Sequence, residues 1–328
     1  MGKIAFIFPG QGAQYPGMGK DFYENFQEAR LIFEEANESL NMDLKSMCFE
    51  GPNEELVKTE NTQPAILTTS IAMMKVLEKE GIDCDYTAGL SLGEYTALVK
   101  SGGVKFSDAV RLVKIRGKLM QETVPEGVGS MAAVLGLSRD KILEAIEQVK
   151  DKYLVEIANY NSPEQIVITG EKEGIQLVCE KVLEMGAKKA VVLPVSAPFH
   201  SSLLKSAGEK LKEELEKVSF YDLTKELISN VDAKPVVKKE EVKEKLVKQV
   251  FSSVLWQDSI EFLINEGVDT FIEIGPGKSL TGFVKRTSKL LNKAVTTYYV
   301  NSLDTLKNTI ISLRKGEGYK WIYQVRWP

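Results

Sequence analysis

The stretch that most constrains this chain is Gly89-Leu90-Ser91-Leu92-Gly93, which fits the pattern G-x-S-x-G. A short segment from Asp85 to Ala88 leads into it, and a helix-compatible run from Gly93 to Lys100 follows. Glycine tolerates the close backbone approach that a sharp strand-to-helix turn imposes. Such a turn presents Ser91 at a helix N-terminus, where backbone N–H groups favour negative charge. The pattern predicts a nucleophilic serine; the alternative is an ordinary Gly/Ser turn, since five-residue patterns recur by chance.

Composition narrows the function classes. The 328 residues suit one large domain or two smaller ones, and the net charge of −4 argues against a generally nucleic-acid-binding surface. Cys48, Cys84 and Cys179 lie far apart and only one histidine exists, which argues against a structural zinc site. The start is too short for a signal peptide and we find no apolar run of transmembrane length. We therefore expect a cytoplasmic protein that binds neither nucleic acid nor membrane.

The first strand is expected at Lys3 to Phe8 and is followed by the glycine-rich loop Pro9 to Gln14. This loop lacks the spacing and the lysine of a phosphate cradle, so we expect no nucleotide cofactor. The alternative is that glycine lets the loop pass close to another loop. Gln11 could then aim its side-chain amide at the active site as an oxyanion donor.

A helix is predicted from Ser107 to Thr123, and Arg116 lies one turn from its apolar residues. An arginine beside an apolar face usually extends its charged end to water or pairs with a structural carboxylate. Alternatively, its guanidinium could hold a substrate carboxylate with two parallel hydrogen bonds. Spacing alone favours the structural interpretation.

The middle of the chain predicts a small inserted α+β subdomain over residues 128–196. Its strands and helices are expected in the order β-α-β-β-α-β, which is that of a ferredoxin-like unit. The strands are Ser130 to Leu137, Tyr153 to Asn159, Gln165 to Gly170 and Ala190 to Val195, and the helices are Ser138 to Lys150 and Glu171 to Met185.

His200 is the only histidine and follows this subdomain directly. A lone histidine is more often an incidental residue than a catalyst. It is nevertheless the one side chain whose ordinary pKa suits a general base at neutral pH, and subdomain junctions are where active sites gather. If Ser91 is a nucleophile, His200 is its only histidine partner.

After His200, strands are expected at Glu226 to Val231 and Phe271 to Ile274. Residues 313–328 form an aromatic, basic tail to which the sequence assigns no function.

Taken together, these motifs resemble the malonyl-CoA:acyl carrier protein transacylases of fatty-acid synthesis, over about Lys3 to Leu306. Several separate motifs in family order are more specific than G-x-S-x-G alone. They are Phe6 to Gln14, Gln63-Pro64-Ala65, Ser91 to Tyr95, Arg116-Gly117 with Met120-Gln121, Pro198-Phe199-His200 and Glu273 to Gly277.

The resemblance implies an α/β fold: an α/β-hydrolase-like core with a parallel sheet (1–127 and 197–312) and the inserted ferredoxin-like subdomain (128–196). It implies that Ser91 takes the malonyl group from malonyl-CoA as an ester, with His200 as general base, in ping-pong kinetics. The implied roles of four further residues are these: Leu92 N–H and Gln11 form the oxyanion hole, Arg116 pairs with the malonyl carboxylate and Gln249 orients His200 through a carbonyl. We expect a monomer without a cofactor, whose second substrate is acyl carrier protein.

Two positions bear on how far the resemblance extends. Many family members have histidine where this chain has Leu90, which is not the general base. Phe199 resembles malonyl-selective members, whereas methylmalonyl users often have serine there. Acyl carrier proteins are acidic, so docking requires a basic patch, for which Lys188-Lys189 and Lys285-Arg286 are candidates.

Three other functions stay open at this point. A serine esterase or thioesterase would use the same serine and histidine with water as acceptor, and a stand-alone acyltransferase could serve a polyketide synthase. A non-enzymatic scaffold would be expected to have lost Ser91, His200 or Gln11, and this chain keeps all three. Arg116 discriminates against a general lipase, because a cationic group suits a dicarboxylic acyl chain.

Overall fold

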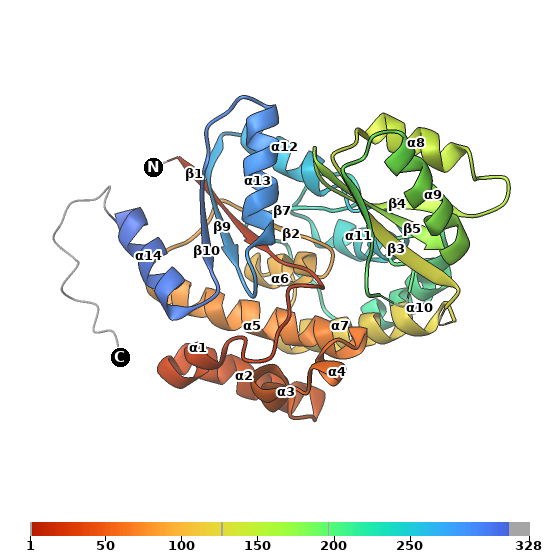
Figure 1. The fold of residues 1–328 in the computed structure, drawn as a ribbon. Coiled ribbons are helices and arrows are strands. Elements are labelled where there is room, and N and C mark those ends of the chain that lie inside the picture. Colours follow the sequence, from red (N-terminus) through yellow and green to blue (C-terminus); the bar gives the residue numbers. More distant parts are fainter. Residues whose placement is uncertain (1, 126, 196, 315–328) are drawn as a thin grey trace.

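The computed structural model describes residues 2–125, 127–195 and 197–314 and contains two sheets flanked by helices (Figure 1). The larger sheet has the strand order β10-β9-β1-β2-β7-β8. Neighbouring strands run parallel, except that the edge strand β8 is antiparallel to β7. The two edge strands, β8 and β10, were not predicted. Its strands are β1 (Lys3–Phe8), β2 (Tyr86–Gly89), β7 (Glu226–Ile228), β8 (Pro235–Val236), β9 (Val268–Ile274) and β10 (Thr296–Val300).

Helices cover both faces of this sheet, which explains why β1 is apolar from Ile4 to Phe8. Phe6 and Phe8 belong to the same apolar cluster as residues of α2, α5 and α7, whereas Ala5 and Ile7 pack with α12 and α13 on the opposite face. The helices of the larger part are α1 (Lys20–Asn25), α2 (Gln27–Leu40), α3 (Leu44–Glu50), α4 (Asn53–Leu56), α5 (Thr59–Lys79), α6 (Gly93–Lys100), α7 (Phe106–Glu122), α10 (Lys205–Glu216), α11 (Lys239–Phe251), α12 (Trp256–Asn265), α13 (Ser279–Leu290) and α14 (Leu303–Arg314), with a short 3-10 turn at Ser202–Leu204.

The smaller sheet has the order β4-β5-β3-β6 and is antiparallel throughout. Its elements follow the predicted β-α-β-β-α-β order, and its helices pack on an apolar core of their own. The α/β fold with a parallel sheet and a second, smaller α+β unit is therefore confirmed. The elements are β3 (Gly129–Leu135), α8 (Arg139–Glu147), β4 (Val155–Ser162), β5 (Gln165–Glu171), α9 (Lys172–Glu184) and β6 (Lys189–Val192).

Several predicted boundaries were wrong. The sequence from Asp21 to Leu40 predicts one helix, but the structure breaks it at Phe26, whose extended backbone separates α1 from α2. The sequence from Pro64 to Glu80 also predicts a helix, but α5 begins earlier, at Thr59, and Pro64 lies inside it. Leu313 and Arg314 were assigned to the tail, but Leu313 is buried in α14 and Arg314 pairs with Glu80. The rest of the predicted tail, 315–328, lies outside the described residues.

The register of the larger sheet decides where the functional loops meet. Phe8 at the end of β1 pairs with Gly89 at the end of β2, and Ala88 pairs with Ile228 at the end of β7. The segments that follow these three strands therefore leave the sheet side by side at its carboxyl edge. This edge faces the smaller sheet across a cleft.

Candidate active site

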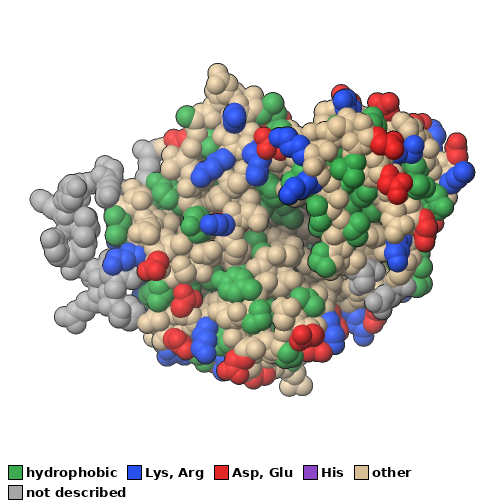
Figure 2. Space-filling model, in the orientation of Figure 1, with side chains coloured by type: hydrophobic (Ala, Val, Ile, Leu, Met, Phe, Trp, Pro, Cys, Tyr) green, Lys and Arg blue, Asp and Glu red, His purple; other side chains and the backbone are tan. Residues whose placement is uncertain are grey.

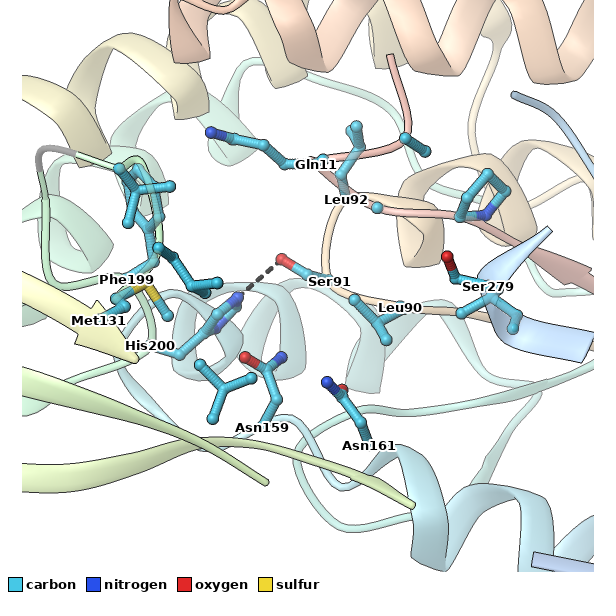
Figure 3. Close-up of a pocket in the computed structure, with 18 of the residues that line it drawn as sticks. Gln11, Leu90, Ser91, Leu92, Met131, Asn159, Asn161, Phe199, His200 and Ser279 are labelled. Atoms are coloured by element: carbon cyan, nitrogen blue, oxygen red, sulfur yellow. Dashed lines mark hydrogen bonds between the residues drawn. The ribbon is translucent and has the colours of Figure 1, made fainter. Parts of the chain in front are cut away.

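Ser91 lies on the turn between β2 and α6 and has a left-handed backbone, with φ 54°. A Cβ on Gly93 would lie 2.1 Å from the carbonyl oxygen of Phe8, so this position must be glycine. The predicted strand–turn–helix context is confirmed. The close fit against β1 forces the sharp turn, which turns the Ser91 side chain toward the cleft (Figure 3).

The glycine-rich loop after β1 passes next to this turn. A Cβ on Gly10 would lie 2.5 Å from the carbonyl oxygen of Leu90, so the predicted close passage of two loops is confirmed. The side chain of Leu90 lines the cleft beside Ser91. The residue directly before the nucleophile is therefore an apolar part of the cavity wall.

His200 comes from the segment between β6 and α10 and meets Ser91 across 109 positions of sequence. Its Nε2 lies 2.7 Å from Ser91 Oγ (Figure 3). Its Nδ1 lies 2.8 Å from the backbone oxygen of Gln249. A backbone oxygen can only accept, so Nδ1 carries the imidazole hydrogen and Nε2 is free to accept the Ser91 hydroxyl. This is the tautomer that a general base requires.

The surroundings of His200 also keep the imidazole neutral. Burial, and then the positive charge of Arg116, lower the pKa of His200 to about 3. The base is therefore unprotonated across the neutral pH range and ready to take a proton.

Arg116, on α7, is only 1% exposed. Its Nη1 donates to Gln63 Oε1 at 2.7 Å, and its Nη2 donates to Gln249 Oε1 at 2.9 Å and to Ser91 Oγ at 3.1 Å. Within the described part of the chain, no carboxylate forms an ion pair with it. The interpretation from spacing, a structural ion pair or an end extended to water, was therefore wrong: the guanidinium is buried beside the nucleophile, held by neutral amides.

The side chain of Gln11 does not take the predicted direction. Its Nε2 donates to Thr59 Oγ1 at 3.3 Å, and the chain extends away from the Ser91 hydroxyl along the edge of the cleft (Figure 3). The side-chain amide is therefore not an oxyanion donor in this structure. The backbone N–H groups of Gln11 and Leu92 have no hydrogen-bond acceptor among the described residues, and both residues line the cleft. These backbone groups stay available for the oxyanion role.

The cleft encloses a cavity of about 260 Å³ between the two sheets. Phe199, Leu90 and Met131 give it apolar walls, while Asn159 and Asn161 reach into it from β4 (Figure 3). Asn161 Oδ1 is buried and has no hydrogen-bond partner among the described residues. Neither asparagine was predicted, because β4 by itself resembles any half-buried strand.

Three further site residues were not assigned a role from sequence. Gln63 holds Arg116, as described, and Glu94 and Asn230 bond to each other and to the residues around Ser91. Gln63 and Glu94 belong to the motifs Gln63-Pro64-Ala65 and Ser91 to Tyr95, which marked both positions without predicting what they do. Asn230 directly follows the predicted strand at the carboxyl edge, where polar residues often serve the site.

Three of the four predicted docking residues lie at one end of the cleft. Lys188, Lys189 and Arg286 line a second cavity of about 190 Å³ together with Gln165, which also lines the Ser91 cavity. Arg286 Nε pairs with Glu164 Oε2 at 3.2 Å. Lysine and arginine side chains gather along the edge of the central hollow in Figure 2.

Other site types find no support in the described residues. They contain no group of three or more His, Cys, Asp or Glu side chains that could hold a metal ion. No helix among them is both long and apolar enough to span a membrane.

Residues 5–308 match the acyl transferase domain. The chain belongs to this family. It is 49% identical over 320 residues to the malonyl CoA-acyl carrier protein transacylase of Bacillus subtilis strain 168, covering 96% of this chain and 98% of the relative.

Two solved structures place the fold in the same family. A malonyl CoA-acyl carrier protein transacylase from Clostridium perfringens superimposes with a TM-score of 0.92 at 47% identity, over 96% of this chain and 98% of the other. A malonyl-transacylase in complex with a type II PKS acyl-carrier protein gives 0.91 at 40% identity, over 94% and 99%. The predicted family is therefore confirmed.

Proposed function

We propose that this chain transfers the malonyl group from malonyl-CoA to the phosphopantetheine thiol of acyl carrier protein, through a malonyl ester on Ser91, and so supplies fatty-acid synthesis. The family and its transacylase relatives support this reaction. The single observation that carries the choice of acyl group is Arg116, a buried guanidinium beside Ser91 without a carboxylate partner among the described residues. An acyl chain that ends in a carboxylate supplies the missing charge.

In the first half-reaction, Ser91 Oγ attacks the thioester carbon while its proton moves to His200 Nε2. The negative charge that develops on the thioester oxygen is stabilised by the backbone N–H groups of Leu92 and Gln11. Collapse of this intermediate breaks the carbon–sulfur bond, and His200 returns the proton to the departing CoA thiolate. The product is malonyl-Ser91 and free coenzyme A.

The second half-reaction reverses these steps with the carrier protein's thiol as nucleophile. His200 Nε2 takes the thiol proton, the sulfur attacks the ester carbon, and the proton returns to Ser91 Oγ as the ester bond breaks. Throughout, the Gln249 carbonyl holds Nδ1–H, so the same nitrogen of His200 exchanges the proton in both directions. No cofactor is required by this sequence of steps.

Arg116 also links substrate binding to the base. In the free protein its charge helps to lower the pKa of His200. A malonyl carboxylate bound to Arg116 offsets that charge, which raises the proton affinity of His200 as the transfer begins. A substrate without the carboxylate leaves the pKa of His200 low, so His200 is a weaker base for that substrate.

The test is intact mass spectrometry after brief mixing with malonyl-CoA, for the wild type and Ser91→Ala. We expect a malonyl adduct that maps to Ser91, is absent from the variant, and passes to carrier protein faster than it hydrolyses. An adduct lost to water without preference for the carrier would identify a hydrolase instead. Absence of an adduct with every acyl-CoA would contradict the role of Ser91.

A polyketide-type carrier is the second candidate acceptor, because the solved relative is bound to a type II PKS acyl-carrier protein. Both carriers use the same thiol, so the chemistry above is unchanged. Comparing kcat/KM for the two carrier types separates the candidates. We also propose a monomeric, cytoplasmic enzyme, which light scattering and cell fractionation would test.

Docking of the acidic carrier is proposed at the basic residues Lys188, Lys189 and Arg286, which are exposed at one end of the cleft, and at the exposed Lys285 next to Arg286 in sequence. Charge reversal at Lys189 and Arg286 is expected to raise the KM for carrier protein several-fold, with kcat for acylation by malonyl-CoA unchanged. An unchanged KM would reject this patch.

A further inference from the structure

Glu94 is a buried carboxyl group that the mechanism above does not use. It lies in the first turn of α6, three residues after the nucleophile, and is 1% exposed. Its Oε2 accepts hydrogen bonds from Gln249 Nε2 at 2.6 Å and from the backbone N–H of Asn230 at 3.3 Å. Both of these partners in turn bond to the Ser91 turn.

The two amide side chains hold the backbone of Ser91 on both sides. Asn230 Oδ1 accepts from the Ser91 N–H at 2.7 Å, and Asn230 Nδ2 donates to the Gly89 oxygen at 2.8 Å. Gln249 Nε2 donates to the Ser91 oxygen at 2.8 Å. A non-glycine residue at φ 54° is sparsely populated and persists only where its surroundings hold it. Glu94 accepts a hydrogen bond from each of the two residues that hold Ser91, namely Asn230 and Gln249.

Gln249 also joins Glu94 to the rest of the site. Its Oε1 accepts from Arg116 Nη2 at 2.9 Å, and its backbone oxygen accepts from His200 Nδ1. Rotating the amide by half a turn would place its oxygen against the Glu94 carboxylate and its NH2 against the guanidinium. The carboxylate on one side and Arg116 on the other therefore fix the direction of this amide.

We propose that Glu94 is a positioning residue for acyl transfer, which acts through the Gln249 amide and Asn230 to hold Ser91, His200 and Arg116 in register. The proposal rests on the proposed acyl transfer for its kinetic readout. It assigns Glu94 no contact with substrate.

The cost of burying Glu94 supports a role other than stability. Burial raises its pKa to about 7, so the ionised carboxylate is disfavoured where it stands. Glutamine has the same shape and its oxygen can still accept from Gln249 and Asn230 without carrying a charge. Its NH2 can also donate, so it no longer fixes the direction of the Gln249 amide. We therefore expect Glu94→Gln to fold with a melting temperature no lower than that of the wild type.

The kinetic test compares Glu94→Gln with the matched control Glu171→Gln, in the small sheet, where Oε2 accepts from the Leu154 backbone N–H at 2.7 Å. We expect Glu94→Gln to lower kcat for malonyl transfer about tenfold with KM little changed, and Glu171→Gln to leave both unchanged. Equal rates for the wild type and Glu94→Gln would overturn the proposal.

A second readout uses the single histidine of the chain. In protein without an affinity tag and labelled with 15N-histidine, every imidazole signal belongs to His200. We expect Glu94→Gln to move the Nδ1–H resonance and broaden it, because the carbonyl of Gln249 is less firmly held. If the folded Glu94→Gln variant shows this resonance at its wild-type position and width, Glu94 does not position His200, and the proposal is overturned.

A double-mutant cycle tests the route of action, using Gln249→Leu, which keeps the backbone carbonyl. If Glu94 acts mainly through the Gln249 side chain, with the Asn230 N–H at 3.3 Å as the weaker contact, Glu94→Gln slows the Gln249→Leu variant by much less than tenfold. Rate losses that multiply would overturn the proposed route. Should Glu94→Gln not fold, wild-type rates in Gln249→Leu overturn it equally.

Inactivation of Ser91 by phenylmethylsulfonyl fluoride separates this proposal from the proposed function. The reagent needs the Ser91–His200 pair and no carboxylate recognition. About tenfold slower inactivation of Glu94→Gln would support the positioning role even if malonyl-CoA proved to be the wrong donor. Inactivation at the wild-type rate would count against it.

Discussion

The two walls of the cleft differ in what they contribute to the site. The wall built on the larger sheet supplies Ser91, His200 and Arg116, together with the buried Glu94 behind them. Among the described residues that line the Ser91 cavity, those from the smaller sheet, together with the two that follow β6 most closely, carry no titratable side chain. They are Met131, Ala133, Asn159, Asn161, Gln165, Val167, Leu193 and Val195.

The architecture explains this difference. Parallel strands bring the segments after β1, β2 and β7 to one edge, so polar groups distant in sequence can form one network there. The antiparallel sheet alternates its side chains and uses one face for a separate apolar core. The larger part therefore holds the reacting groups, and the smaller part shapes the space in front of them.

The largest effect that would follow from this division is expected at the base. We expect His200→Ala to lower kcat about 10⁴-fold, since no other described group accepts the Ser91 proton. Steady-state malonyl transfer measures this loss. Activity within tenfold of the wild type would contradict the conclusion that the larger part of the molecule supplies the catalytic base.

Arg116→Ala is expected to lower kcat/KM for malonyl-CoA about 10³-fold, because the acyl carboxylate loses its buried partner. Acetyl-CoA lacks the carboxylate and serves as the matched substrate, with an expected change below about tenfold. Equal losses for both substrates would show that Arg116 supports Ser91 rather than selecting the acyl group.

The low pKa of His200 predicts a specific pH dependence of stability. In the unfolded chain His200 binds a proton below its ordinary pKa near 6.5, whereas in the folded protein it stays neutral down to about 3. Protons therefore favour the unfolded state in this window. Relative to His200→Gln, we expect the wild type to lose about 3 kcal/mol of unfolding free energy between pH 7 and pH 4. Urea unfolding at both pH values measures it, and a constant difference between the two proteins would contradict the buried neutral base.

The smaller wall should respond more weakly. We expect Asn161→Ala to raise the KM for malonyl-CoA by at most about tenfold, because this residue lines the cavity and no hydrogen bond joins it to Ser91 or His200. Ser162→Ala is the matched control, since that hydroxyl is equally buried and unpartnered among the described residues but does not line the cavity. A loss in kcat as large as that of Arg116→Ala would break the comparison between the walls.

The sequence was sufficient for features that short-range rules control. The G-x-S-x-G pattern predicted the turn at Ser91, because glycine is required where Gly93 approaches the Phe8 oxygen. The order of strands and helices predicted the smaller α+β unit, and the family resemblance implied the parallel sheet. The strand Lys3–Phe8 and the helix Gly93–Lys100 have the predicted boundaries. The need of a nucleophilic serine for a general base predicted that His200, the only histidine, pairs with Ser91, and the two side chains are in contact.

Only the tertiary structure decided which residues surround Ser91 and His200. Local spacing assigned Arg116 to a structural ion pair, yet amides from α5 and α11 hold it beside Ser91. The direction of the Gln11 side chain was set by Thr59, on a helix whose start was mispredicted. Sequence patterns record propensity and periodicity within one element. Hydrogen bonds between elements depend on strand order and register, and for this protein those place Glu94, Asn230 and Gln249 behind the nucleophile.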